Sequence, residues 1–271
     1  MFKKMNFYLL LIVFYEIELI STISQNVKTE QAIIKNITAN YSKDVRPSDQ
    51  VVITTTIAFK QLEDLDEKKE TFTFTIEPFF SWYDERLIWQ PSSFNGISHV
   101  RIKSSLLWNP DIFLYNSVES KNGFLQNDVY GYVNSSGRIL VDYPNQQIKV
   151  ACNLDMTNYP FDKQNCSILL TSWNFYKGDV IQLDYDKANF NDKEFIQDTI
   201  WDLKFKSPIN EEMKLNNRTV LKFEMVFSRK FKYFVFTVII PLVLVQIMIF
   251  FTFRPTEKSK KGEHDDSIKE S

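Results

Sequence analysis

Alternation of apolar and polar positions along most of the chain predicts β-strands. Residues 71–76 read TFTFTI, a period of two that fits a strand with one buried face, and residues 51–59 read VVITTTIAF, rich in β-branched side chains. Further runs of this kind follow at even spacing: VYGYV (129–133), RILVDY (138–143), QIKVAC (147–152), CSILLTSW (166–173), VIQLDY (180–185), TIWDLKF (199–205) and TVLKFEMVFSR (219–229). The pattern indicates a mainly β fold, a ten-stranded β-sandwich.

Other segments of the chain have patterns that do not fit a strand. Ile33, Ile34, Ile37 and Tyr41 fall at helical spacing, which predicts a helix before the first strand. The tetrapeptide from Asn134 to Gly137 separates two strand patterns and predicts a hairpin turn, since Asn and Gly tolerate turn dihedrals. The charged stretch EDLDEKKE is expected to be a solvated turn.

One long apolar stretch lies towards the other end of the chain. Residues 233–253 contain 21 uncharged residues, a helix of ~31 Å, which matches the hydrocarbon core of a bilayer. Basic residues flank it on both sides, so a transmembrane helix is expected over residues 231–253, with a polar cytoplasmic tail over residues 254–271. Pro241 should distort this helix, and Gln246 favours packing against other helices.

The first residues have the pattern of a secretion signal. Lys3 and Lys4 precede nine apolar residues from Phe7 to Tyr15, and small residues follow at 21–24. The alternative is a short anchor helix, but nine residues span only ~14 Å. We therefore expect a signal peptide over residues 1–24 and an extracellular domain over residues 25–230.

Composition narrows the functional classes. Hydrophobic residues make up 44% of the chain, enough for a sizeable core, and a net charge of −2 offers no basic footprint for nucleic acid. His99 and His264 stand alone, and we find no metal-ligand cluster, Gly-rich phosphate loop or nucleophile elbow. The sequence therefore predicts neither an enzyme nor a bound metal or cofactor.

Secretion makes the two cysteines informative. Cys152 and Cys166 enclose thirteen residues, and in an oxidising compartment such a pair usually forms a disulfide, which would stabilise the fold by about 3 kcal/mol. Two buried free thiols are the alternative. Glycosylation sequons support the same compartment, at Asn36, Asn40, Asn134 and Asn217, with Asn165 as a fifth.

Several motifs then carry a family resemblance. The cysteines enclose Tyr-Pro-Phe-Asp at residues 159–162, and the chain also contains WYDERLIW (82–89), WNPDIFLYN (108–116), VNSSGR (133–138) and SW (172–173). In this order and spacing the chain resembles the Cys-loop, or pentameric, ligand-gated ion channels, nicotinic-type subunits in particular. The Ile-Ile-Pro-Leu of the apolar stretch is similar to their first transmembrane helix, so the resemblance covers about residues 28–253.

The resemblance implies a role for the disulfide loop. In the family this loop lies at the base of the extracellular domain and passes movement from the ligand site to the pore. Tyr159, Pro160 and Phe161 would form its apolar tip, and Asp162 would pair with a base or cap the loop. Without the family pattern, the favoured interpretation would be that the disulfide only joins two strands.

The family also implies a ligand site between two subunits, an aromatic box for a quaternary ammonium group, each desolvated face contributing up to ~2 kcal/mol. Tyr115 and Trp173 match two positions of its principal side. Taken singly, each could be an ordinary buried aromatic of a sandwich, as we expect of Trp82, Trp89, Trp108 and Trp201.

Two departures from the family pattern affect this site. Residues 205–227 hold neither the adjacent cysteines nor the tyrosines of a principal subunit, and Glu77 stands where a complementary subunit has Trp. A carboxylate can pair with an ammonium group, so an amine remains a possible ligand. Acetylcholine binding by this chain alone is not expected, and an accessory or orphan subunit fits better.

We therefore interpret the chain as a ligand-gated channel subunit of the cell membrane, single-pass with an extracellular N-terminal domain; a postsynaptic membrane is one such location. Its expected partners are a small neurotransmitter-like ligand, other subunits in a pentamer and membrane lipid. With one predicted span it holds no pore-lining helix, as in a fragment, a truncated product or an accessory subunit. The alternative is a single-span ligand-binding decoy or modulatory protein. An immunoglobulin-like domain is excluded, because its cysteines lie several tens of residues apart.

Overall fold

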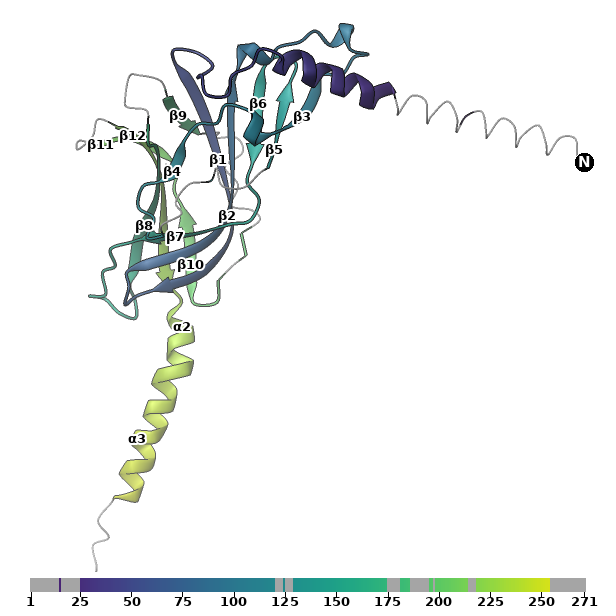
Figure 1. The fold of residues 1–271 in the computed structure, drawn as a ribbon. Coiled ribbons are helices and arrows are strands. Elements are labelled where there is room, and N and C mark those ends of the chain that lie inside the picture. The colour runs from purple at the N-terminus through teal and green to yellow at the C-terminus, as the bar shows by residue number, and fades with distance from the viewer. Residues whose placement is uncertain are drawn as a thin grey trace, which may run out of the picture.

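The computed structural model describes residues 15, 25–119, 124, 129–174, 181–185, 195–196, 198–213 and 218–253. Figure 1 shows a β-sandwich with the helix of residues 25–38 (purple) across one end and an apolar helical segment (yellow-green) leaving the opposite end. The predicted signal peptide, Tyr15 aside, and the predicted polar tail lie outside the described residues. The expected architecture of helix, sandwich and apolar helix is confirmed.

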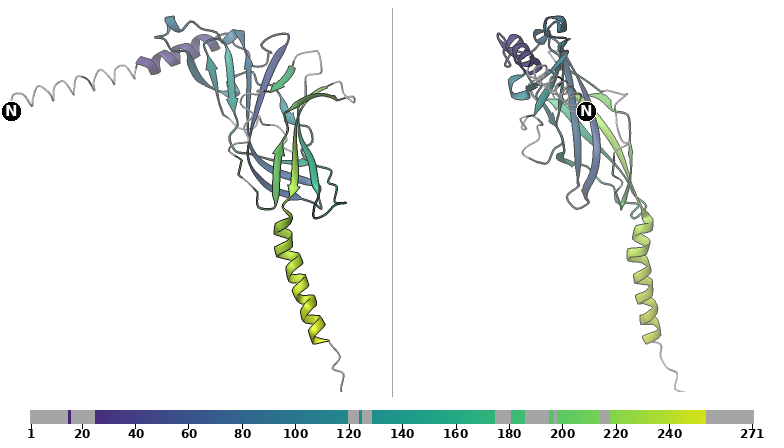
Figure 2. Two further views of the ribbon diagram at one scale, coloured as in Figure 1. Left: turned by 180° about the vertical axis from the view of Figure 1, so that it is seen from behind. Right: turned by 90° about the vertical axis from the view of Figure 1, so that its right-hand side faces the viewer.

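Two sheets form the sandwich, as the two views of Figure 2 show. The first has the order β3-β5-β6-β2-β1-β9, with β7 also paired to β2; the second has the order β10-β12-β8-β4, with β11 also paired to β12. The first sheet contains β1 (Val51–Asp66), β2 (Thr71–Tyr83), β3 (His99–Lys103), β5 (Tyr130–Asn134), β6 (Arg138–Asp142), β7 (Gln146–Ala151) and β9 (Ile181–Tyr185). The second contains β4 (Ile112–Leu114), β8 (Lys163–Ser172), β10 (Trp201–Phe205), β11 (Ile209–Met213) and β12 (Arg218–Arg229).

Every predicted strand run forms a strand, and three short strands, β3, β4 and β11, add to them. Short 3₁₀ turns connect some of these elements, η1 (Glu85–Leu87), η2 (Pro91–Ser93) and η3 (Ser104–Leu106). Of the charged stretch expected to be a turn, only residues 67–70 form the turn between β1 and β2; residues 63–66 are the last four residues of β1.

Inward-facing aromatic side chains hold the two sheets together. Phe72 and Phe74 of β2 and Phe227 of β12 are fully buried. Their ring centroids lie 5.7 Å apart for Phe72–Phe227 and 6.1 Å apart for Phe74–Phe227. Burial of such a side chain contributes up to about 3 kcal/mol, so this cluster fixes β12 against the first sheet.

Tyr41 attaches the end of the N-terminal helix to the sandwich. Ile33 and Ile37 bury the inner face of the helix, as the spacing predicts. Beyond it, the Tyr41 hydroxyl donates to Asp84 Oδ2 at 2.9 Å and accepts from the Trp108 amide at 2.9 Å. Burial raises the pKa of Tyr41 well above its ordinary value. This network fixes how the helix sits on the end of the sandwich.

The apolar segment consists of α2 (Phe231–Phe234), a π-helical turn over Val235–Ile239 and α3 (Ile240–Thr252). Together these make a 22-residue helix, and among the described residues it is the one helix long and apolar enough to cross a membrane. The Ile240 amide bonds back five residues to Val235, next to Pro241, which has no amide hydrogen. The expected distortion thus takes the form of a π-turn.

We predict that two glycines with positive φ respond differently to alanine. Gly137 in the β5–β6 turn has φ of 84°, and a Cβ there would lie 2.6 Å from the Asp84 carbonyl oxygen. Gly96 has φ of 79° and open space around its Cβ position. Gly96→Ala should cost about 1 kcal/mol from backbone conformation alone. Gly137→Ala should cost about 3 kcal/mol, because backbone must also move.

Thermal unfolding of both variants in detergent, followed by tryptophan fluorescence, measures the difference. Equal losses would contradict the packing of this turn against Asp84.

Candidate functional site

The disulfide between Cys152 and Cys166 is confirmed, with an S–S distance of 2.02 Å. It joins the residue after β7 to β8 and closes a loop at the end of the sandwich from which α2 leaves. The Cys152 amide also donates to the Glu70 carbonyl at 2.8 Å, which ties the loop to the β1–β2 turn.

Arg229 is the central residue at this end of the sandwich. It is the last residue of β12 and falls in the same alternating phase as the buried Phe223, Met225 and Phe227. Its side chain is only 8% exposed. A guanidinium group in such a place must be paired, because an isolated charge is costly to remove from water.

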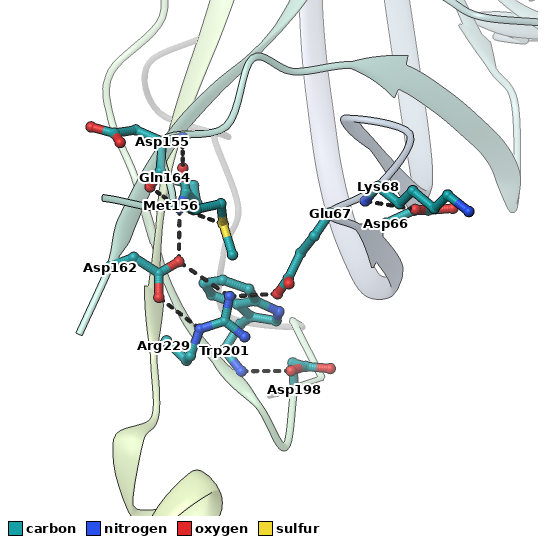
Figure 3. Close-up of polar contacts among 10 residues, drawn as sticks. All are labelled: Asp66, Glu67, Lys68, Asp155, Met156, Asp162, Gln164, Asp198, Trp201 and Arg229. Carbon is teal, nitrogen blue, oxygen red and sulfur yellow. Dashed lines mark hydrogen bonds and ion pairs between the residues drawn. The ribbon is translucent and has the colours of Figure 1, made fainter. Parts of the chain in front are cut away.

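Two carboxylates pair with this guanidinium (Figure 3). Asp162 binds it in a bidentate manner, with Nε–Oδ1 at 2.7 Å and Nη2–Oδ2 at 3.1 Å. Glu67, from the β1–β2 turn, lies with Oε1 2.5 Å from Nη2. Asp162 is almost fully buried, so the contact joins the disulfide loop, the first hairpin and the final strand of the sandwich.

Further side chains complete the surroundings of the pair. The Arg229 guanidinium carbon lies 4.2 Å from the ring centroid of Trp201 and 4.8 Å from that of Tyr159, distances at which aromatic faces attract a cation. On the other side, Gln164 Nε2 donates to Asp162 Oδ2 at 2.7 Å. Both charges of the pair are thus held in place.

Charge states at this contact follow from the pairing. Burial alone would raise the pKa of Asp162, but hydrogen bonds from Arg229 and Gln164 outweigh it and hold that pKa below its usual range. For Arg229, the hydrogen bonds that its guanidinium donates to Asp162 and Glu67 outweigh desolvation and raise the pKa. The stability that Asp162 contributes is therefore present above its unfolded pKa of about 3.9 and is lost only in acid.

The tip of the disulfide loop touches the start of the apolar helix. The ring of Tyr159 meets Phe234 edge-on, with centroids 5.2 Å apart, and Phe161 lies 5.7 Å from Phe231. The peptide between Tyr159 and Pro160 is cis. The predicted apolar tip therefore contacts α2 through two aromatic pairs.

Directly after β4 and β8 of the second sheet, Tyr115 and Trp173 lie at the surface and are 38% and 62% exposed. Asp111 accepts hydrogen bonds from Ser172 Oγ and, at 2.6 Å, from the Asn174 amide, which fixes the turn that carries Trp173. The Trp173 ring packs edge-on against Phe113 at 5.3 Å.

Both aromatics are therefore available for contact at the surface. By contrast, the tryptophans expected in the core are buried there, Trp82, Trp89, Trp108 and Trp201.

Glu77 belongs to the other sheet. It lies on β2, where its carboxylate is 2.9 Å from Lys60 Nζ of β1. Asp142 on β6 is its neighbour, and burial together with the Glu77 carboxylate raises the pKa of Asp142 to about 6. The structure thus brings Glu77 together with Lys60 and Asp142, and not with Tyr115 or Trp173.

Where the structure describes them, the predicted glycosylation asparagines lie at the surface. Asn36, Asn40, Asn134 and Asn165 are exposed. Asn217 lies outside the described residues.

Three residues of this region were not predicted from the sequence: Arg229, Glu67 and Asp111. Arg229 could have been predicted, because the alternation along its strand places it among the inward-facing positions, where a charge requires a partner. Glu67 had none, since it is one of several acids in a charged turn. Asp111 stands within the WNPDIFLYN motif, but its contact with the turn after β8 depends on the fold.

Comparison with known proteins agrees with this geometry. Residues 30–231 match the neurotransmitter-gated ion-channel ligand binding domain. The chain is 32% identical to the human (Homo sapiens) neuronal acetylcholine receptor subunit beta-3 over 65% of its own length and 39% of that protein. It is 30% identical to acetylcholine receptor subunit alpha-type acr-15 of Caenorhabditis elegans over 86% of its length and 50% of that protein.

The sandwich with a disulfide loop at its base thus defines a receptor domain of the ligand-gated channel class. The chain belongs to the Cys-loop, pentameric ligand-gated ion channel family and resembles its nicotinic acetylcholine receptor subunits. It spans between 39% and 50% of the length of the two relatives named above. These relatives are receptor subunits and not enzymes.

We predict that Asp162→Asn destabilises the chain by about 3 kcal/mol, because it leaves a buried guanidinium without its bidentate partner. Glu224→Gln is the matched control, since Glu224 pairs with Lys206 at 3.1 Å and Lys222 at 2.8 Å on the surface and should cost at most about 1 kcal/mol. Denaturant unfolding in detergent, followed by tryptophan fluorescence, compares the two. Equal costs would show that the buried pair has no special weight.

A second prediction concerns pH and Asp142. Its folded pKa of about 6 lies above the unfolded value of about 3.9, so the folded state binds the proton more tightly. The contribution of Asp142 to stability should therefore fall as pH rises from about 4 to about 6. Asp142→Asn should flatten the change of melting temperature over this range, whereas Asp202→Asn tests the general effect of removing one carboxylate. An unchanged slope in the Asp142 variant would refute this assignment.

Proposed function

We propose that this chain is the ligand-responsive part of a pentameric channel subunit, in which ligand binding between subunits is passed to the membrane helix through Arg229. The observation that carries the proposal is the position of this side chain. It ends the last strand, one intervening residue separates it from α2, and it holds the disulfide loop and the β1–β2 turn. A shift of either segment therefore acts directly on the base of the helix.

Ligand binding between two subunits is supported by the placement of the candidate residues. Tyr115 and Trp173 directly follow β4 and β8 of the second sheet, while Glu77 lies on β2 of the first. A small ligand that touches both sets must therefore contact two chains. This is the arrangement of a ring in which one face of each subunit meets the opposite face of the next.

The mechanism is a shift between two states. A ligand that binds one arrangement of the interface more tightly than the other biases the equilibrium by the difference in affinity. The disulfide and the Arg229–Asp162 pair make the loop and the last strand move as one body. The Tyr159–Phe234 and Phe161–Phe231 contacts then carry the movement to α2.

The same proposal assigns a location to each part of the chain. Residues 1–24 direct secretion, residues 25–230 lie outside the cell, residues 231–253 cross the cell membrane and residues 254–271 face the cytoplasm. The disulfide supports an oxidising compartment for the sandwich, and the length of the apolar helix supports the crossing. Gln246 would face a neighbouring helix within the assembly.

Within such an assembly we assign the chain an accessory role. Residues 205–217, before the last strand, contain no tyrosine or cysteine that could line a ligand site. Glu77 is already paired with Lys60. The remaining aromatic walls of a site would come from a partner subunit.

Co-expression with a full-length alpha-type acetylcholine receptor subunit tests the function. We expect the chain to reach the cell surface with its partner and to change the acetylcholine concentration for half-maximal current. Arg229→Lys keeps the charge but loses the bidentate bond, so it should reach the surface and shift that concentration by about fivefold or more. Arg46→Lys, in an exposed loop, is the control and should leave it unchanged.

Surface biotinylation separates loss of assembly from loss of coupling. Normal surface assembly with currents identical to those of the partner alone would contradict the proposed function. Identical currents from the wild type and Arg229→Lys would contradict the role of Arg229.

A further inference from the structure

The amide group of Gln164 holds the inner side of the disulfide loop. This side chain is buried. Its Oε1 accepts from the Asp155 amide at 2.8 Å, and its Nε2 donates to the Asp155 carbonyl at 2.8 Å and to Asp162 Oδ2 at 2.7 Å. The last two bonds use both hydrogens of the amide nitrogen. The carboxylate that pairs with Arg229 therefore depends on an amide that has no further hydrogen to donate.

The sulfur of Met156 lies next to this amide. Its Sδ is 3.8 Å from Gln164 Nε2, and Figure 3 shows the thioether pointing from the loop towards the side chains of Trp201 and Arg229. A thioether is only a weak acceptor, so at this distance it leaves the two stronger bonds of the amide intact. The arrangement thus fits a methionine in its reduced form.

Met156 is also the methionine that an oxidant in water reaches most easily. The structure describes the side chains of three methionines, Met156, Met225 and Met248. Met156 is partly exposed in the disulfide loop, whereas Met225 is buried in the core of the sandwich. Met248 belongs to the apolar helix, whose surroundings in a membrane are lipid. Oxidation of methionine by a small dissolved oxidant is therefore expected first at Met156.

We propose that Met156 is a site of reversible oxidation, at which a peroxide converts the thioether to a sulfoxide and thereby weakens the contact between Gln164 and Asp162. With hydrogen peroxide, one oxygen atom is transferred to the sulfur, the O–O bond breaks and water leaves. The sulfur loses two electrons and the peroxide gains them. A methionine sulfoxide reductase reverses the step, removing the oxygen as water while two thiols are oxidised to a disulfide.

The sulfoxide changes the competition for the Gln164 amide. Its oxygen is a strong acceptor, and a polar group beside a buried amide is costly to leave unpaired. Either Nε2 gives up one of its present acceptors to bond this oxygen, or the Met156 side chain leaves the loop for water. Both outcomes loosen the segment that presents Tyr159 and Phe161 to α2. The modification itself is independent of the proposed function, whereas its effect on channel currents rests on that function.

Peptide mass spectrometry of the full chain in lipid nanodiscs tests the site. We expect dilute hydrogen peroxide to add one oxygen to Met156 at least about tenfold faster than to the buried Met225. Equal rates at the two residues, or faster oxidation of Met225, would overturn the inference.

Thermal unfolding of the same samples tests the effect on the loop. Oxidation should lower the melting temperature by about 3 °C or more, and methionine sulfoxide reductases for both epimers should restore it. Met156→Leu keeps the volume without the sulfur, so it should fold and lose the response to peroxide. Met248→Leu is the matched control and should respond as the wild type does. An oxidised Met156 with an unchanged melting temperature, or an equal fall in Met156→Leu, would refute the proposal.

Currents from the assembly with the alpha-type subunit connect the modification to function. Brief exposure to peroxide should shift the acetylcholine concentration for half-maximal current at least about twofold in the wild type and leave Met156→Leu unshifted. Equal shifts in the two would contradict an effect through Met156.

Failure of this inference is distinguishable from failure of the proposed function. A chain that is oxidised at Met156 and destabilised, but never alters partner currents, refutes the coupling proposal alone. A chain that alters currents through Arg229, but whose Met156 resists peroxide, refutes the modification site alone.

Discussion

The buried ion pair between Arg229 and Asp162 is the constraint on which the lower end of the molecule depends. Both charged side chains are buried at the lower end of the sandwich core, and burying either charge without the other would be costly. Since they come from the last strand and the disulfide loop, any arrangement that separates these segments leaves an unpaired charge. The disulfide limits the conformational freedom of the loop, and the ion pair determines where the loop packs against the last strand.

This constraint lies at the one point where the sandwich meets the apolar helix. One residue separates Arg229 from α2, and the loop that it anchors presents Tyr159 and Phe161 to the first turn of that helix. The far end of the sandwich is fixed in a similar way, by Tyr41 and the buried Asp84. Between the two, surface-facing aromatics and charges occupy the outer faces, where a second subunit or a ligand can reach them.

Much of the architecture was predictable because it depends on local periodicity. Alternation located the long strands, helical spacing located the N-terminal helix, and an uncharged stretch located the apolar helix. The strands β3, β4 and β11 were not predicted, and β4, with three residues, is too short to show a period. For the candidate site, motifs predicted Trp173 and Tyr115, whereas Asp111, which positions Trp173, was not predicted.

The sequence by itself determined which positions face inward, that two cysteines close a loop, and that one helix is apolar on every side. It also placed an arginine in a buried phase, although not its partners. Only the tertiary structure decided which carboxylates pair with Arg229. Asp162 is 67 residues away from it in the sequence, and Glu67 is 162 residues away. The tertiary structure likewise decided that the Met156 sulfur lies beside the Gln164 amide. Periodicity specifies only the side to which a residue points, whereas pairing depends on strand order and register, which form when distant segments pack together.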